Sequence, residues 1–235
     1  MISATGNLVL DWNDIRLVAF DVDGTLYDQK GLRSCMLREM LVAATRRRRI
    51  DFIRILRVYR KIREQLGESL HEDFERALVS RTAARVGCSE EQVQAVAEEW
   101  LERRPLRHLL RYRYPKLSEL FRQLRQHGKQ IGILSDYPAR RKIEALELEA
   151  DIIVCANDED VGILKPHARG LQVLMSRAGV SPAETILIGD RPDRDGLAAQ
   201  AANVRALIRS ARPVPGWHTF DQYDDPLFAA VGSVA

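Results

Sequence analysis

The sequence predicts an α/β fold, with a parallel sheet of about five strands covered by helices on both faces, and a separate all-α helical segment. Three observations favour this class. Short apolar runs recur along the chain, and most of them stop at polar residues or glycine. Helical patterns of apolar residues lie between the later runs. A long stretch, residues 31–113, shows helical spacing but no clear strand.

The predicted strands are the short apolar runs themselves. A parallel strand that is buried on both faces reads as a continuous apolar run, because neither side of it meets water. In open parallel sheets, ligands bind beyond the carboxyl ends of the strands, so the polar residues after each run are candidates for a site. We expect strands at residues 17–20, 131–134, 152–155, 185–188 and 204–208.

Helices are expected between these strands. One apolar pattern of helical spacing ends before Gly128 and a second ends before Gly179, where glycine permits a left-handed C-terminal turn. A helix of small residues is expected before Asn203, because asparagine tolerates the same left-handed conformation second only to glycine. The tail from Arg212 onward contains three prolines and is expected to be irregular.

The long stretch between the first two predicted strands is expected to form a separate helical domain of three to five helices. Within it, Ser89 and Gln92 have the spacing of a capping box, which marks a helix start. The predicted division is a discontinuous core of residues 1–30 and 114–235 and an inserted domain of residues 31–113. Apolar residues recur near helical spacing at Ile50, Ile53, Leu56, Tyr59 and Ile62.

Charge is distributed unevenly along the 235 residues. The net charge is +3, but residues 31–115 hold 19 basic and 12 acidic residues, a local +7 that leaves −4 for the rest. No apolar run approaches the roughly 18 residues of a membrane span, and the first residues do not resemble a secretory signal. The three cysteines lack metal or disulfide spacing, which suits a reducing compartment. We therefore expect a cytoplasmic protein; the oligomeric state is left open.

Four consecutive arginines, residues 46–49, begin a basic stretch that continues to Arg63. Its arginines lie opposite an apolar face, which is typical of a helix whose charged side is simply solvated. Peripheral contact with a membrane or a lipid phosphate is the alternative, and nucleic acid is not expected as a partner.

Acidic, hydroxyl and lysine side chains follow four of the predicted strands. The four segments are Asp21-Val22-Asp23-Gly24-Thr25-Leu26, Ile133-Leu134-Ser135-Asp136, Gly162-Ile163-Leu164-Lys165-Pro166 and Gly189-Asp190-Arg191-Pro192-Asp193-Arg194-Asp195. Together they resemble the four motifs of the haloacid dehalogenase superfamily, and in particular its phosphoglycolate phosphatase-like members. The resemblance covers about residues 15–30 and 113–210, and it implies a Rossmann-like core with a helical cap inserted between the first and second motifs.

The chemistry of a phosphomonoester explains why carboxylates recur in these motifs. A carboxylate nucleophile must be relieved of charge repulsion before it approaches a dianionic phosphate, and a hard divalent cation provides that relief. Asp21 and Asp190 are expected to hold Mg²⁺, and the resemblance adds the backbone carbonyl of Asp23. Attack by Asp21 would form an aspartyl-phosphate, while Asp23 would protonate the leaving oxygen and then activate water. The sequence thus predicts a magnesium-dependent phosphatase for a small phosphomonoester, such as phosphoglycolate or a sugar phosphate.

The remaining motif residues are expected to bind the phosphate or to support the site. Lys165 supplies a fixed positive charge against the phosphoryl oxygens. Thr25, Ser135 and Asp136 are expected at the phosphate, the first two through hydroxyl and backbone N–H groups. Gly24 permits an unusual backbone angle close to the substrate.

The second acid of the fourth motif and the reaction type leave alternatives open. Asp195 is preferred to Asp193, and the resemblance implies that it either touches the water shell of the metal or orients Lys165. The presence of Asp23 disfavours dehalogenase activity, because that reaction has no leaving alkoxide for an acid to protonate. A phosphonatase would need a lysine in the insert, where Lys61 is the single candidate. Two alternatives to a phosphatase stay open. One is a phosphomutase of the same superfamily, and the other is a non-catalytic module that binds a membrane or partner through its basic helix.

Overall fold

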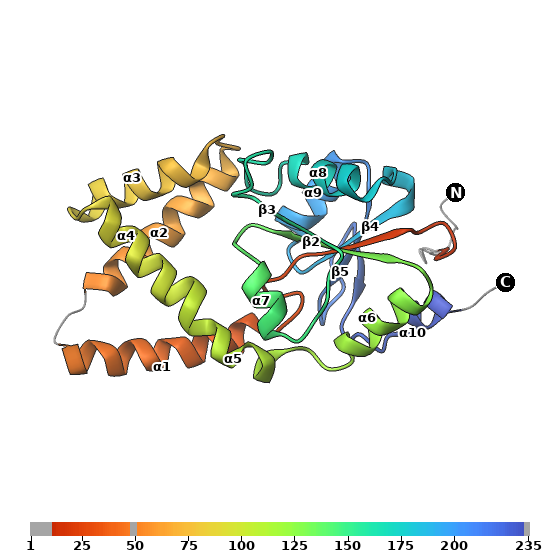
Figure 1. The fold of residues 1–235 in the computed structure, drawn as a ribbon, viewed down its shortest axis with the longest axis horizontal. Helices are drawn as coiled ribbons and strands as arrows, with labels where there is room; N and C mark the ends of the chain where they lie inside the picture. Colours follow the sequence, from red (N-terminus) through yellow and green to blue (C-terminus); the bar gives the residue numbers. More distant parts are fainter. Residues whose placement is uncertain (1–10, 48–50, 233–235) are drawn as a thin grey trace.

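A computed structural model describes residues 11–47 and 51–232. Its centre is a parallel sheet of six strands in the order β3-β2-β1-β4-β5-β6, with β1 near the middle (Figure 1). The predicted α/β class is therefore confirmed, with one strand more than expected. The strands are β1 (Leu17–Phe20), β2 (Gln130–Ser135), β3 (Ile152–Cys155), β4 (Thr185–Gly189), β5 (Arg205–Arg209) and β6 (His218–Phe220).

Helices cover both faces of the sheet because successive side chains of a buried strand point to opposite sides. Leu17 and Ala19 lie in one apolar cluster with helices α8 (Arg169–Ala178) and α9 (Leu197–Ala201). Val18 and Phe20 lie in the other, larger cluster. The helices of this second face, shown below the sheet in Figure 1, are α6 (Leu117–Gln126), α7 (Arg140–Ala145) and α10 (Pro226–Ala229).

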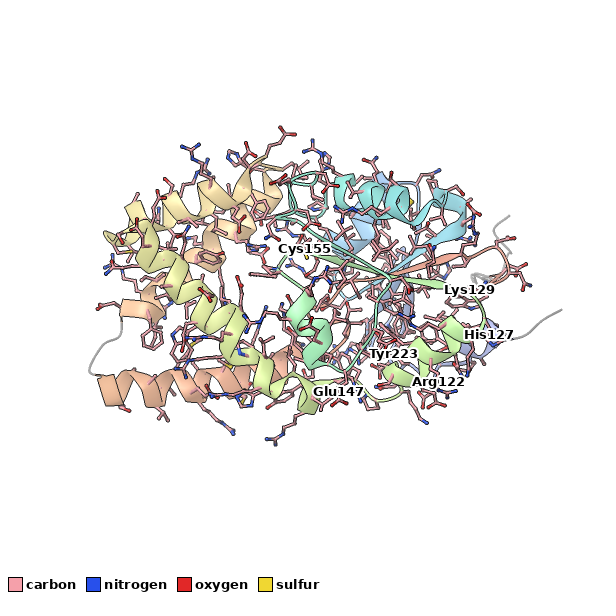
Figure 2. The ribbon with its side chains drawn as sticks, viewed as in Figure 1. Arg122, His127, Lys129, Glu147, Cys155 and Tyr223 are labelled. Carbon is pink, nitrogen blue, oxygen red and sulfur yellow. The ribbon has the colours of Figure 1, made fainter. Side chains whose placement is uncertain are left out.

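The tail after Arg212 is more regular than expected. It contains the edge strand β6 and helix α10, so the prediction of an irregular tail was wrong there. Figure 2 shows Tyr223 from this tail, and its hydroxyl donates to the carbonyl oxygen of Thr25 at 2.7 Å. The tail therefore supports the loop that follows β1. Other predicted details are confirmed: Asn203 has a φ of 57°, and Ser89 and Gln92 form a capping box.

Apart from turns and the isolated bridges at its two ends, the described part of the segment between β1 and α6 is helical. A π-helical segment, Glu98–Arg103, joins two of its helices, and none of the described helices is both long and apolar enough to cross a membrane. Helices two to four of the segment share a small core around Leu66, Phe74 and Leu78. The helices are α1 (Gln29–Arg47), α2 (Asp51–Glu68), α3 (Phe74–Val86), α4 (Glu90–Ala97) and α5 (Arg104–Tyr112).

The chain enters and leaves this helical segment at one place. The backbone N–H of Asp28 donates to the carbonyl of Tyr112 at 2.8 Å, and that of Tyr114 donates to Leu26 at 3.1 Å. Tyr27 and Arg113 form an antiparallel bridge between the same two stretches. The helical insert, which we call the cap, is thus connected to the sheet through two adjacent stretches of backbone.

Candidate active site

The predicted site residues lie at the carboxyl edge of the sheet, where β1 is flanked by β2 and β4. Phe20 is in register with Ile133 on one side and Ile188 on the other, so the residues after these strands lie at neighbouring positions. Asp21 follows β1 directly, and Asp190 follows β4 directly. The topology therefore brings the first and fourth motifs together, although 169 positions separate the two aspartates in the sequence.

Lys165 connects two of the buried carboxylates. Its Nζ lies 2.5 Å from Asp21 Oδ1 and 2.6 Å from Asp195 Oδ1, and the three side chains are between 2% and 9% exposed. Burial raises the pKa of Asp21 well above its usual value, and the nearby Lys165 opposes that rise. Burial disfavours the charged form of Lys165, but the negative charges of Asp195 and Asp21 hold its pKa well above the usual value.

Asp195 also connects the lysine to the loop that follows β4. Its Oδ2 accepts hydrogen bonds from the backbone N–H groups of Asp190, at 3.2 Å, and Arg191, at 3.0 Å. Gly189 has no room for a Cβ atom because the side chain of Asp195 occupies that space. Asp193 lies outside, 63% exposed, and pairs with Arg191. Of the two acids considered in the sequence, only Asp195 contacts Lys165.

Asp190 carries a carboxylate that is only partly satisfied. Its Oδ1 is buried and has no hydrogen-bond partner in the described part of the chain. Burial and, to a smaller extent, the charge of Asp195 raise its pKa to about 6. Carboxylate oxygens of Asp21, Asp190 and Asp195 lie within 4.8 Å of one another. Since Mg²⁺ prefers several hard oxygen ligands, the carboxylates of Asp21 and Asp190 fit that ion, which would give the buried Asp190 Oδ1 a partner.

Gly24 lies against Asp190 and has a φ of 101°. A Cβ atom at this position would collide with the Asp190 carboxylate. Any other residue would therefore be strained by the backbone angle and would also displace the acid. The requirement for glycine here is steric as well as conformational.

Asp23 is held by two side chains that the sequence analysis did not single out. Lys142 Nζ lies 2.7 and 2.8 Å from its two carboxylate oxygens, and the hydroxyl of Tyr27 also donates to it. Burial opposes ionisation of Asp23, but Lys142 and the hydrogen bond from Tyr27 lower its pKa overall. Lys142 is buried although it follows Arg140 and Arg141, which are exposed. A basic run of this kind is typical of a solvated helix face, so the sequence does not indicate that Lys142 is buried against Asp23.

The predicted phosphate-binding residues lie around Asp21 and Lys165. The Thr25 hydroxyl is buried and donates to Asp21 Oδ2 at 3.0 Å. Ser135 Oγ accepts from the backbone N–H of Tyr137 at 3.2 Å, so its hydroxyl shapes the second-motif loop. Asp136 Oδ1 accepts from the Lys165 backbone N–H at 2.9 Å. The structure therefore brings all of these residues together, with Asp136 bonded to the loop that carries the lysine.

Comparison with known proteins agrees with this geometry. A family model described as a haloacid dehalogenase-like hydrolase matches residues 15–203. The chain belongs to the haloacid dehalogenase-like hydrolases. The expectation drawn from the four motifs is thus confirmed at the level of the family, and the protein is a hydrolase.

Relatives of this hydrolase include named phosphatases. Phosphoglycolate phosphatase 1 of Pseudomonas aeruginosa is 26% identical over 193 residues, which cover 81% of this chain and 67% of that protein. Glyceraldehyde 3-phosphate phosphatase of Methanothermobacter thermautotrophicus is 22% identical over 201 residues, covering 83% and 85%. Among solved structures, a 2-haloacid dehalogenase from Pseudomonas syringae has a TM-score of 0.63 at 20% identity, covering 92% and 98% of the two chains. That likeness shows the shared fold.

The cap of the hydrolase reaches the site through α2. The guanidinium of Arg63 donates to the carbonyl of Asp136 and lies 3.8 Å from the ring centre of Tyr137. Glu64 accepts from Arg194 at 2.8 Å. This end of the basic stretch therefore faces the catalytic loops, whereas residues 48–50 and the side chains of Arg46 and Arg47 lie outside the described part.

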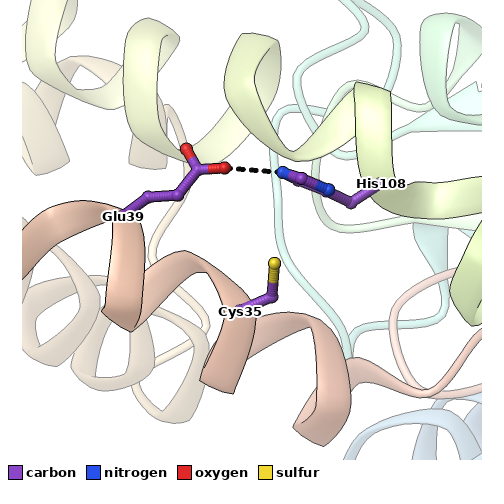
Figure 3. A group of neighbouring side chains, drawn as sticks. All are labelled: Cys35, Glu39 and His108. Carbon is purple, nitrogen blue, oxygen red and sulfur yellow. Dashed lines mark hydrogen bonds and ion pairs between the residues drawn. The ribbon is translucent and has the colours of Figure 1, made fainter. Parts of the chain in front are cut away.

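A second group with metal-ligand chemistry lies between α1 and α5. Figure 3 shows Cys35, Glu39 and His108 there, with Glu39 Oε1 2.6 Å from His108 Nε2. The other oxygen of Glu39 is bonded to Arg107 and lies 3.6 Å from Arg104. Two guanidinium groups already neutralise this carboxylate and would repel a cation. The group therefore serves as an ion-pair network that connects the two helices.

Proposed function

We propose that this hydrolase is a Mg²⁺-dependent phosphatase that cleaves a small phosphomonoester in the cytoplasm through an aspartyl-phosphate on Asp21. One observation supports the proposal most strongly. Lys165 forms buried ion pairs with Asp21 and Asp195, and next to them lies the Asp190 carboxylate, whose Oδ1 has no hydrogen-bond partner among the described residues. A nucleophile, a fixed cation and oxygen ligands for a metal are what phosphoryl transfer to a carboxylate requires.

The metal site would consist of the carboxylates of Asp21 and Asp190 and the backbone carbonyl of Asp23. When bound there, Mg²⁺ supplies positive charge that offsets the repulsion between the carboxylate and the substrate phosphate. Asp195 holds Lys165 and the backbone of residues 190 and 191, so we assign it a supporting role. The loop carrying Asp190 keeps its shape through that contact.

The first step forms a bond between an Asp21 carboxylate oxygen and phosphorus and breaks the bond to the leaving oxygen. Lys165 is already 2.5 Å from Asp21, where its ammonium stabilises charge on the phosphoryl oxygens. The hydroxyl groups of Thr25 and Ser135 and nearby backbone N–H groups complete the phosphate contacts. Asp136 orients the Lys165 loop through its hydrogen bond to the lysine backbone, so its contribution is indirect.

Proton transfer is the role of Asp23. It would donate a proton to the leaving oxygen and then accept one from the water that cleaves the aspartyl-phosphate. Lys142 and Tyr27 fix its carboxylate and favour the ionised form, which is the form that accepts a proton from water. The donating form must therefore be reached by proton uptake before the leaving oxygen departs.

The decisive experiment is hydrolysis of para-nitrophenyl phosphate with and without Mg²⁺. We expect Mg²⁺-dependent turnover in the wild type and a loss of about a thousandfold or more in Asp21→Asn, because the nucleophile is removed. Asp193→Asn is the matched control, since Asp193 lies on the surface of the same site loop and contacts Arg191. Turnover that persists in Asp21→Asn, or that does not depend on Mg²⁺, would show that the mechanism is wrong.

A further inference from the structure

Two adjoining cavities lie beneath the cap. The first, about 270 Å³, is lined by Asp21, Lys165 and Asp190, the residues of the proposed phosphate site. The second, about 80 Å³, lies on the side of Asp23 and Lys142. Both are lined by Asp23, Gln29, Arg33 and Tyr137, so they share a common wall. A substrate with its phosphate in the first cavity would place its leaving group, next to the proposed acid Asp23, in the second.

The second cavity has an apolar lining with charged groups from the cap. Arg33 on α1 and Arg60 on α2 both line it, and both side chains are solvent-exposed. Glu102 is the acidic cap residue beside them, and burial raises the pKa of its carboxyl. The apolar residues of the cavity are Leu32, Met36, Trp100, Leu101, Pro105, Leu106 and Leu109.

The two arginines differ from the other basic residues around the site. Arg63 is bonded to the carbonyl of Asp136, and Arg194 is bonded to Glu64 and to the carbonyl of Lys165. Within residues 11–47 and 51–232, neither Arg33 nor Arg60 has a carboxylate oxygen within 4.0 Å. Both side chains line the same cavity of about 80 Å³. Burial and, to a smaller extent, the positive charge of Arg33 lower the pKa of Arg60.

We infer that Arg33 and Arg60 form a subsite for a second anionic group, a carboxylate or a phosphate, on the leaving group of the substrate. This inference rests on the proposed function. An anion in this cavity pairs with two guanidinium groups that have no carboxylate partner of their own, and it accepts charge-assisted hydrogen bonds from them. The small cavity limits the leaving group to a short chain, whose carbon atoms contact the apolar lining. A phosphomonoester with an acidic group a few bonds from the ester oxygen has this chemistry.

The test compares pairs of substrates that differ in one anionic group. Phosphoglycolate and its amide have nearly the same shape, and the bisphosphate and monophosphate of ethane-1,2-diol form the second pair. For the wild type, kcat/KM is expected to favour the charged member of at least one pair by about tenfold or more. The first pair reports a carboxylate, and the second reports a phosphate.

The variants Arg33→Met and Arg60→Met are expected to reduce that preference at least fivefold, mainly through KM, because each removes one positive charge from the subsite. Arg33→Lys and Arg60→Lys keep the charge and should retain most of it, which guards against a general folding defect. Arg57→Met is the matched control, because Arg57 is an exposed arginine on α2 that lines neither cavity. It should keep the wild-type preference.

The outcomes separate the subsite from the proposed function. Absence of Mg²⁺-dependent hydrolysis of para-nitrophenyl phosphate by the wild type would overturn both. Normal hydrolysis of that compound with equal kcat/KM values within both pairs would overturn the subsite alone. The subsite would also be wrong if both methionine variants kept the wild-type preference, or if Arg57→Met lost it equally.

Discussion

Lys142 and Asp23 form a nearly buried ion pair at the centre of the site. Their side chains are 8% and 15% exposed, and both oxygens of the carboxylate contact the ammonium group. A buried pair gains little over an apolar replacement, because removing both charges from water costs about as much as their attraction returns. The pair is therefore better explained by the orientation it gives Asp23 than by stability.

Removing one partner of this pair should cost more than removing both charges. Lys142→Met is expected to lower the free energy of unfolding by about 3 kcal/mol, because Asp23 is left buried without its cation. The double variant Asp23→Asn with Lys142→Met should be more stable than Lys142→Met alone. Urea unfolding of the wild type, both single variants and the double variant gives the coupling energy. Additive effects of the two substitutions would contradict this account.

At the scale of single elements, a short turn before β4 shows how a carboxylate can stabilise local structure. Glu184 Oε2 accepts hydrogen bonds from the backbone N–H and the hydroxyl of Ser181, at 2.9 and 2.7 Å. Its other oxygen accepts from Arg16, just before β1, at 3.1 Å. The turn Pro182–Glu184 is thereby connected to the start of the central strand.

This contact predicts a dependence of stability on pH. The hydrogen bonds from Ser181, with Arg16, lower the pKa of Glu184 to about 2. A lowered pKa stabilises the fold above the unfolded value of about 4.3, and the effect disappears as the pH falls toward 2. Glu184→Gln should therefore have a lower Tm than the wild type at pH 7, and the difference should shrink below about pH 4.5.

Thermal unfolding between pH 7 and pH 3 would measure that difference. Glu149→Gln is a suitable control, because Glu149 is exposed and has neither an ion pair nor a side-chain hydrogen bond among the described residues. A Glu184→Gln difference that stays constant over the whole range would show that the carboxylate charge is not responsible.

Several elements could be predicted from sequence because their residues carry a strong local signal. The apolar runs at 17–20 and 152–155 are found as strands with the expected bounds. Strand β6 has no such signal, because it is three residues long, lies at the sheet edge and begins soon after Pro215 and Gly216.

The site residues likewise divide into those that a local sequence signal identifies and those that only the packing of the helices places. The motif residues could be identified because Asp21 and Asp190 directly follow apolar runs and because the order of the four motifs along the chain is that of the family. The sheet then brings Asp21, Lys165 and Asp190 together. Neither Arg33 nor Lys142 belongs to one of the four motifs. Their positions depend on how α1 and α7 lie against the core, which sequence patterns do not specify. The roles of the site residues and the bounds of the cap stay predictions.

At the scale of the whole molecule, ionic contacts connect the cap to the catalytic loops. Glu64 on α2 accepts from Arg194 at 2.8 Å and from Arg191 at 3.1 Å. Arg194 in turn donates to the carbonyl of Lys165 at 2.7 Å. The side chain of Glu64 is 53% exposed, so solvent and salt weaken these pairs. Such contacts favour this position of the cap but are weak enough to let the cap move.

Glu64→Gln should therefore loosen the cap without unfolding the protein. We expect backbone hydrogen exchange in the last turn of α2 and at residues 191–196 to become about two- to fivefold faster, as for a contact of up to about 1 kcal/mol. Exchange measured by mass spectrometry at low and high salt should show that the difference shrinks at high salt. Glu68→Gln, on the same helix and exposed, should exchange like the wild type; an equal change in it would argue against the Glu64 contact.

The paired backbone stretches at residues 26–28 and 112–114 have a consequence for how such a protein can change. The cap leaves and rejoins the core at one place. For the folding of the core, the cap therefore counts as a single long loop. The entropy cost of closing a loop rises by only about 0.6 kcal/mol for each doubling of its length. Caps of very different size could therefore be exchanged at this junction at small cost to the core. Substrate range could then diverge between descendants of one ancestor while the residues of the turn after β1 stay the same.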